Sequence, residues 1–184
     1  MAHETFNDLY VDQIRDLYSA ETQIVDALPA MADAASHAEL RNGFQRHLKQ
    51  TQEHVRRLEQ IAQRLGVEAG GETCKGMKGL LAEGKETFGK HTDRNIRDAA
   101  LIAAAQRVEH YEIAAYGCAR TYANALGKSS DAALLQQTLD EEGETDKKLT
   151  QVAEQVVNPQ AQHSTAAAGT SAHRAKNQEN ELRA

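Results

Sequence analysis

Several acidic and imidazole side chains recur at positions that helical periodicity assigns to a protein interior. The candidate ligands are Glu21, His54, Glu109, Glu112, Glu142 and Asp146. A carboxylate among apolar side chains costs several kcal/mol unless it is paired, protonated or bound to a metal ion. Carboxylates and imidazoles together suit iron, manganese or zinc, and carboxylate-bridged metal pairs occur in the cores of helical bundles. The set predicts a metal site between helices.

Four long helices are expected to carry these side chains. At about 100° per residue, apolar stripes run along about 6–34, 36–65, 94–125 and 129–158. Glu21 falls in the centre of the first stripe. Glu109 and Glu112 share the third stripe, and Glu142 lies in the fourth with Asp146 beside it. The second stripe offers imidazoles and a hydroxyl from His47, Thr51 and His54.

Local signals set the expected ends of these helices. Starts are expected at Thr5 with Asp8, at Ser36 with Glu39, after Asp93, and at Ser129 or Ser130; stops are expected at Gly66, Gly127 and Pro159. Pro29 should kink or interrupt the first helix. Residues 67–91 are rich in glycine and lysine, with a short helix expected over about 77–87.

The lengths of the connections predict the topology. The first and third connections are a few residues each, which makes two antiparallel hairpins, whereas the middle connection has about 25 residues. We therefore predict an all-α, ferritin-like four-helix bundle over 1–158. Residues 159–184 are polar and almost free of bulky apolar side chains, and we expect a disordered tail there.

Positions near the middle of antiparallel helices lie at similar depth, so the inward acids and His54 are expected to converge. His47 lies two turns from His54, about 10 Å by helix rise, and a core or interface role is expected for it. The alternative to a metal site is a metal-free polar core whose acids are protonated or hydrogen-bonded.

Composition narrows the function further. The net charge of −6 and the pI of about 5.7 argue against a nucleic-acid partner. No apolar run is long enough to cross a membrane, and the N-terminus lacks a secretory signal pattern. Cys74 and Cys118 are far apart, which favours reduced thiols and a cytoplasmic location. For Cys74 we expect an incidental thiol; the alternative is a redox-sensing thiol whose pKa is lowered by Lys75 and Lys78.

Several blocks of the chain resemble one protein family. They are 16–21, 27–29, 47–48, 98–117 and 145–149, and they resemble the YciE/YciF-type bacterial stress proteins in the same order over about 4–157. The resemblance implies a ferritin-like fold similar to rubrerythrins, a homodimer, and an association with stress responses whose biochemical activity is poorly defined.

The resemblance also implies a ligand pattern. Rubrerythrin-like sites use Glu on the first helix, Glu-x-x-His on the second, Glu-x-x-Glu on the third and Glu-x-x-His on the fourth. Glu21, Glu109 and Glu112 fit this pattern. Thr51 stands where a bridging Glu is expected, and Thr145 stands where a His is expected, with Asp146 as its substitute. These departures favour one metal ion or an asymmetric pair.

Two functional hypotheses follow. The first is a stress protein that binds iron or manganese and handles iron or peroxide, with Glu109 or Glu142 as the bridge if two ions bind. The second is a non-enzymatic, metal-free helical dimer that acts as a structural or interaction protein. A manganese catalase-like enzyme shares the bundle but needs a fuller ligand set.

Overall fold

The computed structural model describes residues 5–164, which form five α-helices and contain no β-strand. The helices are α1 (Phe6–Ala34), α2 (Ala38–Leu65), α3 (Lys75–Lys90), α4 (Arg94–Ala125) and α5 (Ser129–Val152). None of the described helices combines the length and apolar character that a membrane span requires. The predicted all-α class is confirmed.

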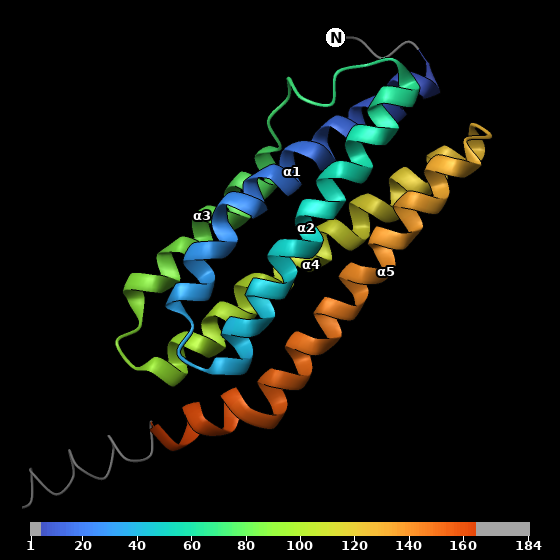
Figure 1. Cartoon of the computed structure of the whole chain (residues 1–184). Coiled ribbons are helices and arrows are strands. Elements are labelled where there is room, and N and C mark those ends of the chain that lie inside the picture. The colour runs from blue at the N-terminus through green and yellow to red at the C-terminus, as the bar shows by residue number, and fades with distance from the viewer. Residues whose placement is uncertain (1–4, 165–184) are drawn as a thin grey trace, which may run out of the picture.

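The four long helices pair as two antiparallel hairpins (Figure 1). The hairpin α1–α2 packs on the hairpin α4–α5, with α1 against α4 and α2 against α5. The crossover, residues 66–93, includes α3, which packs against α1 and α4 and returns the chain to the end of the bundle where α2 began. Two hairpins joined by one long crossover match the predicted topology.

Most helix ends lie where local capping signals place them. Thr5 and Asp8 form a reciprocal capping box, Asp93 accepts hydrogen bonds from two backbone N–H groups of α4, and Gly66 ends α2 with φ +70°. Two expected caps are wrong. His37 rather than Ser36 caps α2, since its imidazole accepts from the Glu39 N–H. The N-cap of α5 is Lys128, whose side chain makes no capping bond.

Two expected interruptions are absent from the described helices. Pro29 lies inside α1, which continues to Ala34, and its exposed position lets water solvate the backbone groups that proline leaves unpaired. After α5, a π-helical turn (Ala153–Val157) leads into a helical segment that runs through residue 164, past the expected stop at Pro159. The predicted disordered tail, 159–184, is thus helical over 159–164, and its remainder lies outside the described residues.

Contacts with α1 and α4 hold the start of α3 in place. The Ser19 hydroxyl accepts a hydrogen bond from the Cys74 N–H, and the Cys74 thiol lies 2.9 Å from the Tyr111 hydroxyl. Cys74 is buried and caps α3. Burial raises the pKa of its thiol, which contradicts the alternative in which neighbouring lysines lower it.

The interior has two apolar clusters with a polar layer between them along the bundle axis. One cluster includes Ile24, Leu28, Phe44 and Leu149, and the other includes Ile14, Leu17, Leu58 and Leu135. Near the middle of each long helix, buried polar residues separate the segment that packs mainly in one cluster from the segment that packs mainly in the other. This polar layer comprises Glu21, His47, Thr51, His54, Glu109, Glu112, Thr138 and Glu142.

Candidate metal centre

Six side chains of the polar layer form two adjacent groups with the composition of a metal site. The first group is His47, Glu109, Glu112 and Glu142; the second is Glu21, His54 and Glu142. Within each group, one ligand atom per residue lies within 4.8 Å of all the others. Because Glu142 belongs to both groups, its two oxygens stand where a carboxylate would bridge two ions.

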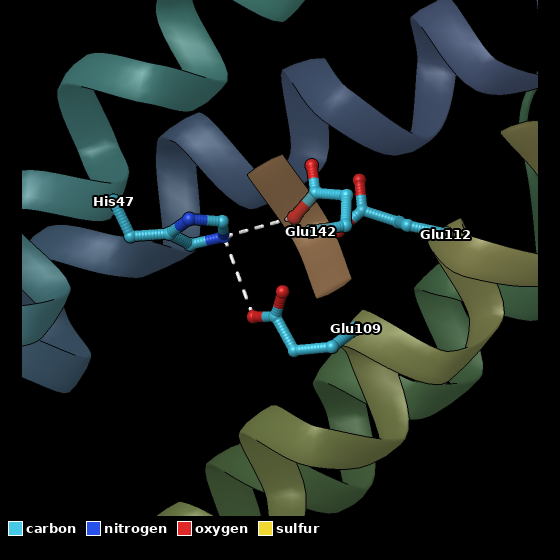
Figure 2. A group of neighbouring side chains, drawn as sticks. All are labelled: His47, Glu109, Glu112 and Glu142. Carbon is cyan, nitrogen blue, oxygen red and sulfur yellow. Dashed lines mark ion pairs between the residues drawn. The ribbon is translucent and has the colours of Figure 1, made fainter. Parts of the chain in front are cut away.

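The first group joins α2, α4 and α5 (Figure 2). His47 Nε2 lies 3.4 Å from Glu109 Oε1 and 3.9 Å from Glu142 Oε2. Glu112 lies one turn along α4 from Glu109, and both carboxylates extend toward Glu142, as Figure 2 shows. This group contains three acids and one imidazole, a donor set that suits iron or manganese.

The second group surrounds His54. Its Nδ1 lies 2.9 Å from Glu142 Oε1 and 3.2 Å from Glu21 Oε1. On the other side of the ring, Nε2 lies 2.8 Å from Glu141 Oε2, and Arg57 in turn donates to both oxygens of Glu141. A histidine that ligates a metal through one nitrogen commonly donates its other N–H to a carboxylate. Glu141 occupies that position.

Burial sets the protonation of the carboxyl groups in the absence of metal. Burial, reinforced by the charge of Glu142, raises the pKa of Glu109 well above its usual range. Burial and the neighbouring carboxylates raise the pKa of Glu112 in the same way, and burial raises that of Glu21. For Glu142, burial alone would raise the pKa, but the contact with His54 lowers it below its usual range. Of the four carboxyl groups, that of Glu142 therefore ionises most readily.

The two histidines respond in opposite directions. Burial lowers the pKa of His47, so its imidazole is neutral. Burial also disfavours the charged form of His54, but the contacts with Glu142 and Glu21 outweigh it and raise the pKa to about 10. Glu141 is partly buried, yet its hydrogen bonds from Arg57 and His54 lower its pKa to about 2.

Many polar atoms of the layer have no hydrogen-bond partner among the described residues. Both oxygens of Glu112, both ring nitrogens of His47 and Glu109 Oε2 are in this state, although all three side chains are buried. Buried polar atoms in folded proteins are almost always satisfied, because leaving one unpaired costs about 1–3 kcal/mol. The carboxylate oxygens and the one His47 nitrogen, Nε2, that face one another are atoms that a bound cation would satisfy.

One tyrosine completes the layer. Tyr116 is fully buried on α4 and donates a hydrogen bond to Glu21 Oε1, which leaves Glu21 Oε2 without a partner among the described residues. Burial and the charge of Glu21 raise the pKa of the Tyr116 phenol well above its usual range. Tyr116 thus orients one candidate ligand and stays protonated.

The structure brings five of the six residues predicted as ligands into the two groups. The exception is Asp146, which accepts a hydrogen bond from Gln106 and lies 3.3 Å from His110 on the outer side of α4. Thr51 and Thr145, which replace a Glu and a His in the family pattern, each donate to the backbone carbonyl four residues earlier. Neither threonine is in the two groups.

Two residues of the site were not among the predicted ligands. His47 was expected not to share an ion with His54 and to have a core or interface role. It is buried and belongs to the first group, whereas His54 belongs to the second, and their ring centroids lie 6.5 Å apart. Glu141 lies beside Glu142 but off the inward stripe of α5, and only its contact with His54 reveals its role.

Comparisons with known proteins agree with this architecture. Residues 5–162 match the model of a family described as a domain of unknown function, DUF892. The chain is 40% identical to Protein YciF of Escherichia coli K12 over 164 residues, which cover 89% of this chain and 99% of that protein.

Solved structures show the same likeness. The crystal structure of the E. coli stress protein YciF matches with a TM-score of 0.81 and 41% identity, over 85% of this chain and 99% of that one. YcfI of Rhodopseudomonas palustris, described as a candidate structural protein, matches with a TM-score of 0.78 and 40% identity, over 80% and 94% of the two chains. A protein of Xanthomonas campestris, 18% identical with a TM-score of 0.70 over 88% and 99% of the chains, shares the fold.

Proposed function

The chain belongs to the DUF892 family, and we propose that its buried polar layer binds two divalent iron or manganese ions that share Glu142. In this proposal, His47, Glu109 and Glu112 hold one ion, and Glu21 and His54 hold the other. The protein would then act as a ferritin-like stress protein that handles iron or peroxide. The description of its E. coli relative as a stress protein supports this role.

The observation that carries the proposal is the state of Glu112. This carboxyl group is fully buried. When it is ionised, neither of its oxygens has a hydrogen-bond donor among the described residues, and only its protonated form can bond to the neighbouring Glu21 carboxylate. A buried carboxylate without a donor is costly, and a cation is the simplest partner for it among the surrounding carboxylates. Charge supports the same conclusion, because two divalent ions would neutralise the four ionised carboxylates of the two groups.

The donor set fits iron or manganese better than a closed structural zinc site. Structural zinc is held mostly by thiolates and imidazoles in a four-coordinate site, whereas the two groups here offer four carboxylates and two imidazoles. When bound, such a pair of ions supplies redox or Lewis-acid chemistry. The protein would contribute ligand orientation through Tyr116 and Glu141, and water exclusion through the apolar clusters on both sides.

Metal content decides the proposal. The full chain, purified without chelators, would be loaded anaerobically with Fe(II) or Mn(II), desalted and measured by elemental analysis. We expect about two ions per chain. Glu112→Ala combined with Glu142→Ala should abolish binding while the helical circular dichroism signal survives. Metal content far below one ion per chain, or unchanged content in the double variant, would refute the assignment.

A metal-free core is the second candidate, and His54 is the observation that favours it. With a pKa near 10 this histidine is an imidazolium with carboxylates on both sides, which compensates the ionised Glu142 and Glu141. Glu109 and Glu112 would then be protonated, since burial raises their pKa values well above the usual range, and burial also raises the pKa of Glu21. The description of the R. palustris relative as a candidate structural protein agrees with this role. No metal uptake together with a cooperative, stable fold would establish it.

A homodimer and a cytoplasmic location are further parts of the proposal. The dimer rests on the family resemblance, and the location rests on the two widely separated cysteines, Cys74 and Cys118. Sedimentation velocity of the purified chain would test the dimer, and fractionation of cells that express it would test the location.

A further inference from the structure

A cavity of about 300 Å³ opens beside the first ligand group, between α1, α2, α4 and α5. Its wall is mostly apolar, with Leu28, Leu40, Phe44 and Val152 among the lining side chains. His47 and Glu109 also line it, so the cavity reaches the candidate metal centre. Most small-molecule sites are of this kind, namely apolar pockets with a few fixed polar groups.

The polar groups of this cavity are of two kinds. His47 is buried, only 4% exposed. Its Nε2 lies 3.4 Å from Glu109 Oε1, and neither of its ring nitrogens has a hydrogen-bond partner among the described residues. The exposed lining residues are instead charged: Arg46, Lys49 and Lys148, against a single lining acid, Glu39; outside the cavity, Lys148 also lies 3.5 Å from Glu144. The cavity thus has an outer rim with an excess of positive charge and an inner, unsatisfied imidazole.

We propose that this cavity binds an oxygenated medium-chain carboxylate, with its carboxylate at the basic rim and a hydroxyl or hydroperoxyl group near His47. Electrostatic complementarity favours an anion at Arg46, Lys49 and Lys148. The apolar wall favours an alkyl chain, and the unpaired imidazole favours a second polar group at the inner end.

The volume indicates the length of the chain. One water occupies about 30 Å³ of liquid, and a methylene group is of similar size, so the cavity accommodates about ten such groups. Decanoate and 10-hydroxydecanoate are therefore suitable probes. Binding to the metal-free protein is independent of the proposed function, whereas the role of such a molecule as the substrate of the site rests on it.

Gly43 offers a way to close the cavity without disturbing the fold. It lines the cavity within α2, and a Cβ atom added there would meet no heavy atom within 4 Å. Glycine in a helix interior is less favourable than other residues by up to about 1 kcal/mol, so Gly43→Leu should preserve α2. Gly117→Leu is the matched control, because Gly117 is also half-buried in a long helix with open space but does not line the cavity.

The test is calorimetric titration of the metal-free full chain with decanoate, 10-hydroxydecanoate and decyltrimethylammonium below their micelle concentrations. We expect 10-hydroxydecanoate to bind about threefold to tenfold more tightly than decanoate, because its hydroxyl satisfies His47. The cationic probe should not bind. Gly43→Leu should abolish binding of both acids, and Gly117→Leu should retain it. Arg46→Gln with Lys148→Gln should weaken binding by about threefold to tenfold.

Several outcomes would overturn the proposal. These are no binding of either acid to the parent chain, equal binding by Gly43→Leu, or equal affinity for the cationic amphiphile. If neither acid binds and Gly43→Leu alters the sedimentation coefficient, the cavity is an interface between copies of the chain. A separate Mn(II) titration of Gly43→Leu keeps the two proposals apart, since this substitution changes none of the proposed metal ligands.

Discussion

Nδ1 of His54 lies 2.9 Å from Oε1 of Glu142, with both side chains fully buried where α2 meets α5. This contact keeps His54 protonated and Glu142 ionised in the absence of metal. A metal ion bound at the same atoms must displace the proton from His54. It must also displace protons from Glu109 and Glu112, whose pKa values burial raises.

Metal binding is therefore expected to release protons. Each proton released makes the apparent affinity rise about tenfold per pH unit, so affinity should fall as the pH is lowered from about 7 to about 6. Calorimetric titration with Mn(II) in two buffers of different ionisation enthalpy measures the number of protons directly. An affinity and heat independent of pH and buffer would contradict the assignment of these ligands.

Glu141 is predicted to support the metal without binding it. Its carboxylate contacts Nε2 of His54 at 2.8 Å, and its low pKa keeps it ionised at neutral pH. Glu141→Gln should reduce metal affinity by about 10-fold to 100-fold, because the ligand loses its orienting carboxylate. The same titration with Mn(II) checks this.

Glu144→Gln is the matched control for this variant. Glu144 lies one turn further along α5, where it is exposed and pairs only with Lys148 at 3.5 Å. Its removal should leave metal affinity unchanged. An equal loss in both variants would assign the effect to net charge rather than to the contact with His54.

Two glycines of α3 should respond oppositely to the same substitution. A Cβ atom at Gly76 would lie 2.9 Å from the Tyr111 ring, whereas one at Gly79 would meet nothing within 4 Å. The ring cannot move away freely, because its hydroxyl contacts Cys74 and donates to Asp16. Gly76→Ala should destabilise the fold by about 1–3 kcal/mol, and Gly79→Ala should stabilise it by up to about 1 kcal/mol.

Urea unfolding followed by circular dichroism measures both changes. Equal stabilisation by the two substitutions would show that α3 is not held against Tyr111.

Asp98 should contribute strongly to stability. It is buried on α4 and accepts hydrogen bonds from the backbone N–H groups of Ser36 and His37, at 2.9 and 2.7 Å. The turn between α1 and α2 is thereby attached to α4. Asp98→Ala leaves two donors without their acceptor and should cost about 2–4 kcal/mol.

The control is Asp33→Ala, since Asp33 is exposed near the same turn. It should change the free energy of unfolding by less than about 0.5 kcal/mol. Similar losses for both variants in thermal or urea unfolding would contradict the role of Asp98.

The fold was largely predictable because its signals are local. Amphipathic periodicity identifies the four long helices, and capping residues such as Thr5, Gly66 and Asp93 place several of their ends. The signals that failed depend on surroundings. Pro29 does not interrupt α1 because it faces solvent, and His37 caps α2 in a turn that Asp98 holds from another helix.

The candidate site was only partly predictable, because helix wheels give the direction of a side chain but not the space around it. The rise between His47 and His54 predicted that the two histidines do not share one ion, and they fall in different groups. The residue between them on the same face, Thr51, is small, and the two rings approach to 6.5 Å. Asp146 lies beside the inward stripe of α5. Its side chain does not join the two groups but accepts a hydrogen bond from Gln106 of α4.

The polar layer has a consequence for the alignment of the helices. If a long helix slid out of this alignment along its neighbours, its inward carboxyl or imidazole groups would move toward one of the apolar clusters, and apolar side chains would face the remaining acids. Either mismatch would leave a buried ionisable group without a partner, at a cost of several kcal/mol. Apolar side chains alone tolerate such slippage, since one leucine replaces another. The residues proposed to bind metal therefore also select one register among the many that alternative packings of the same helices would offer.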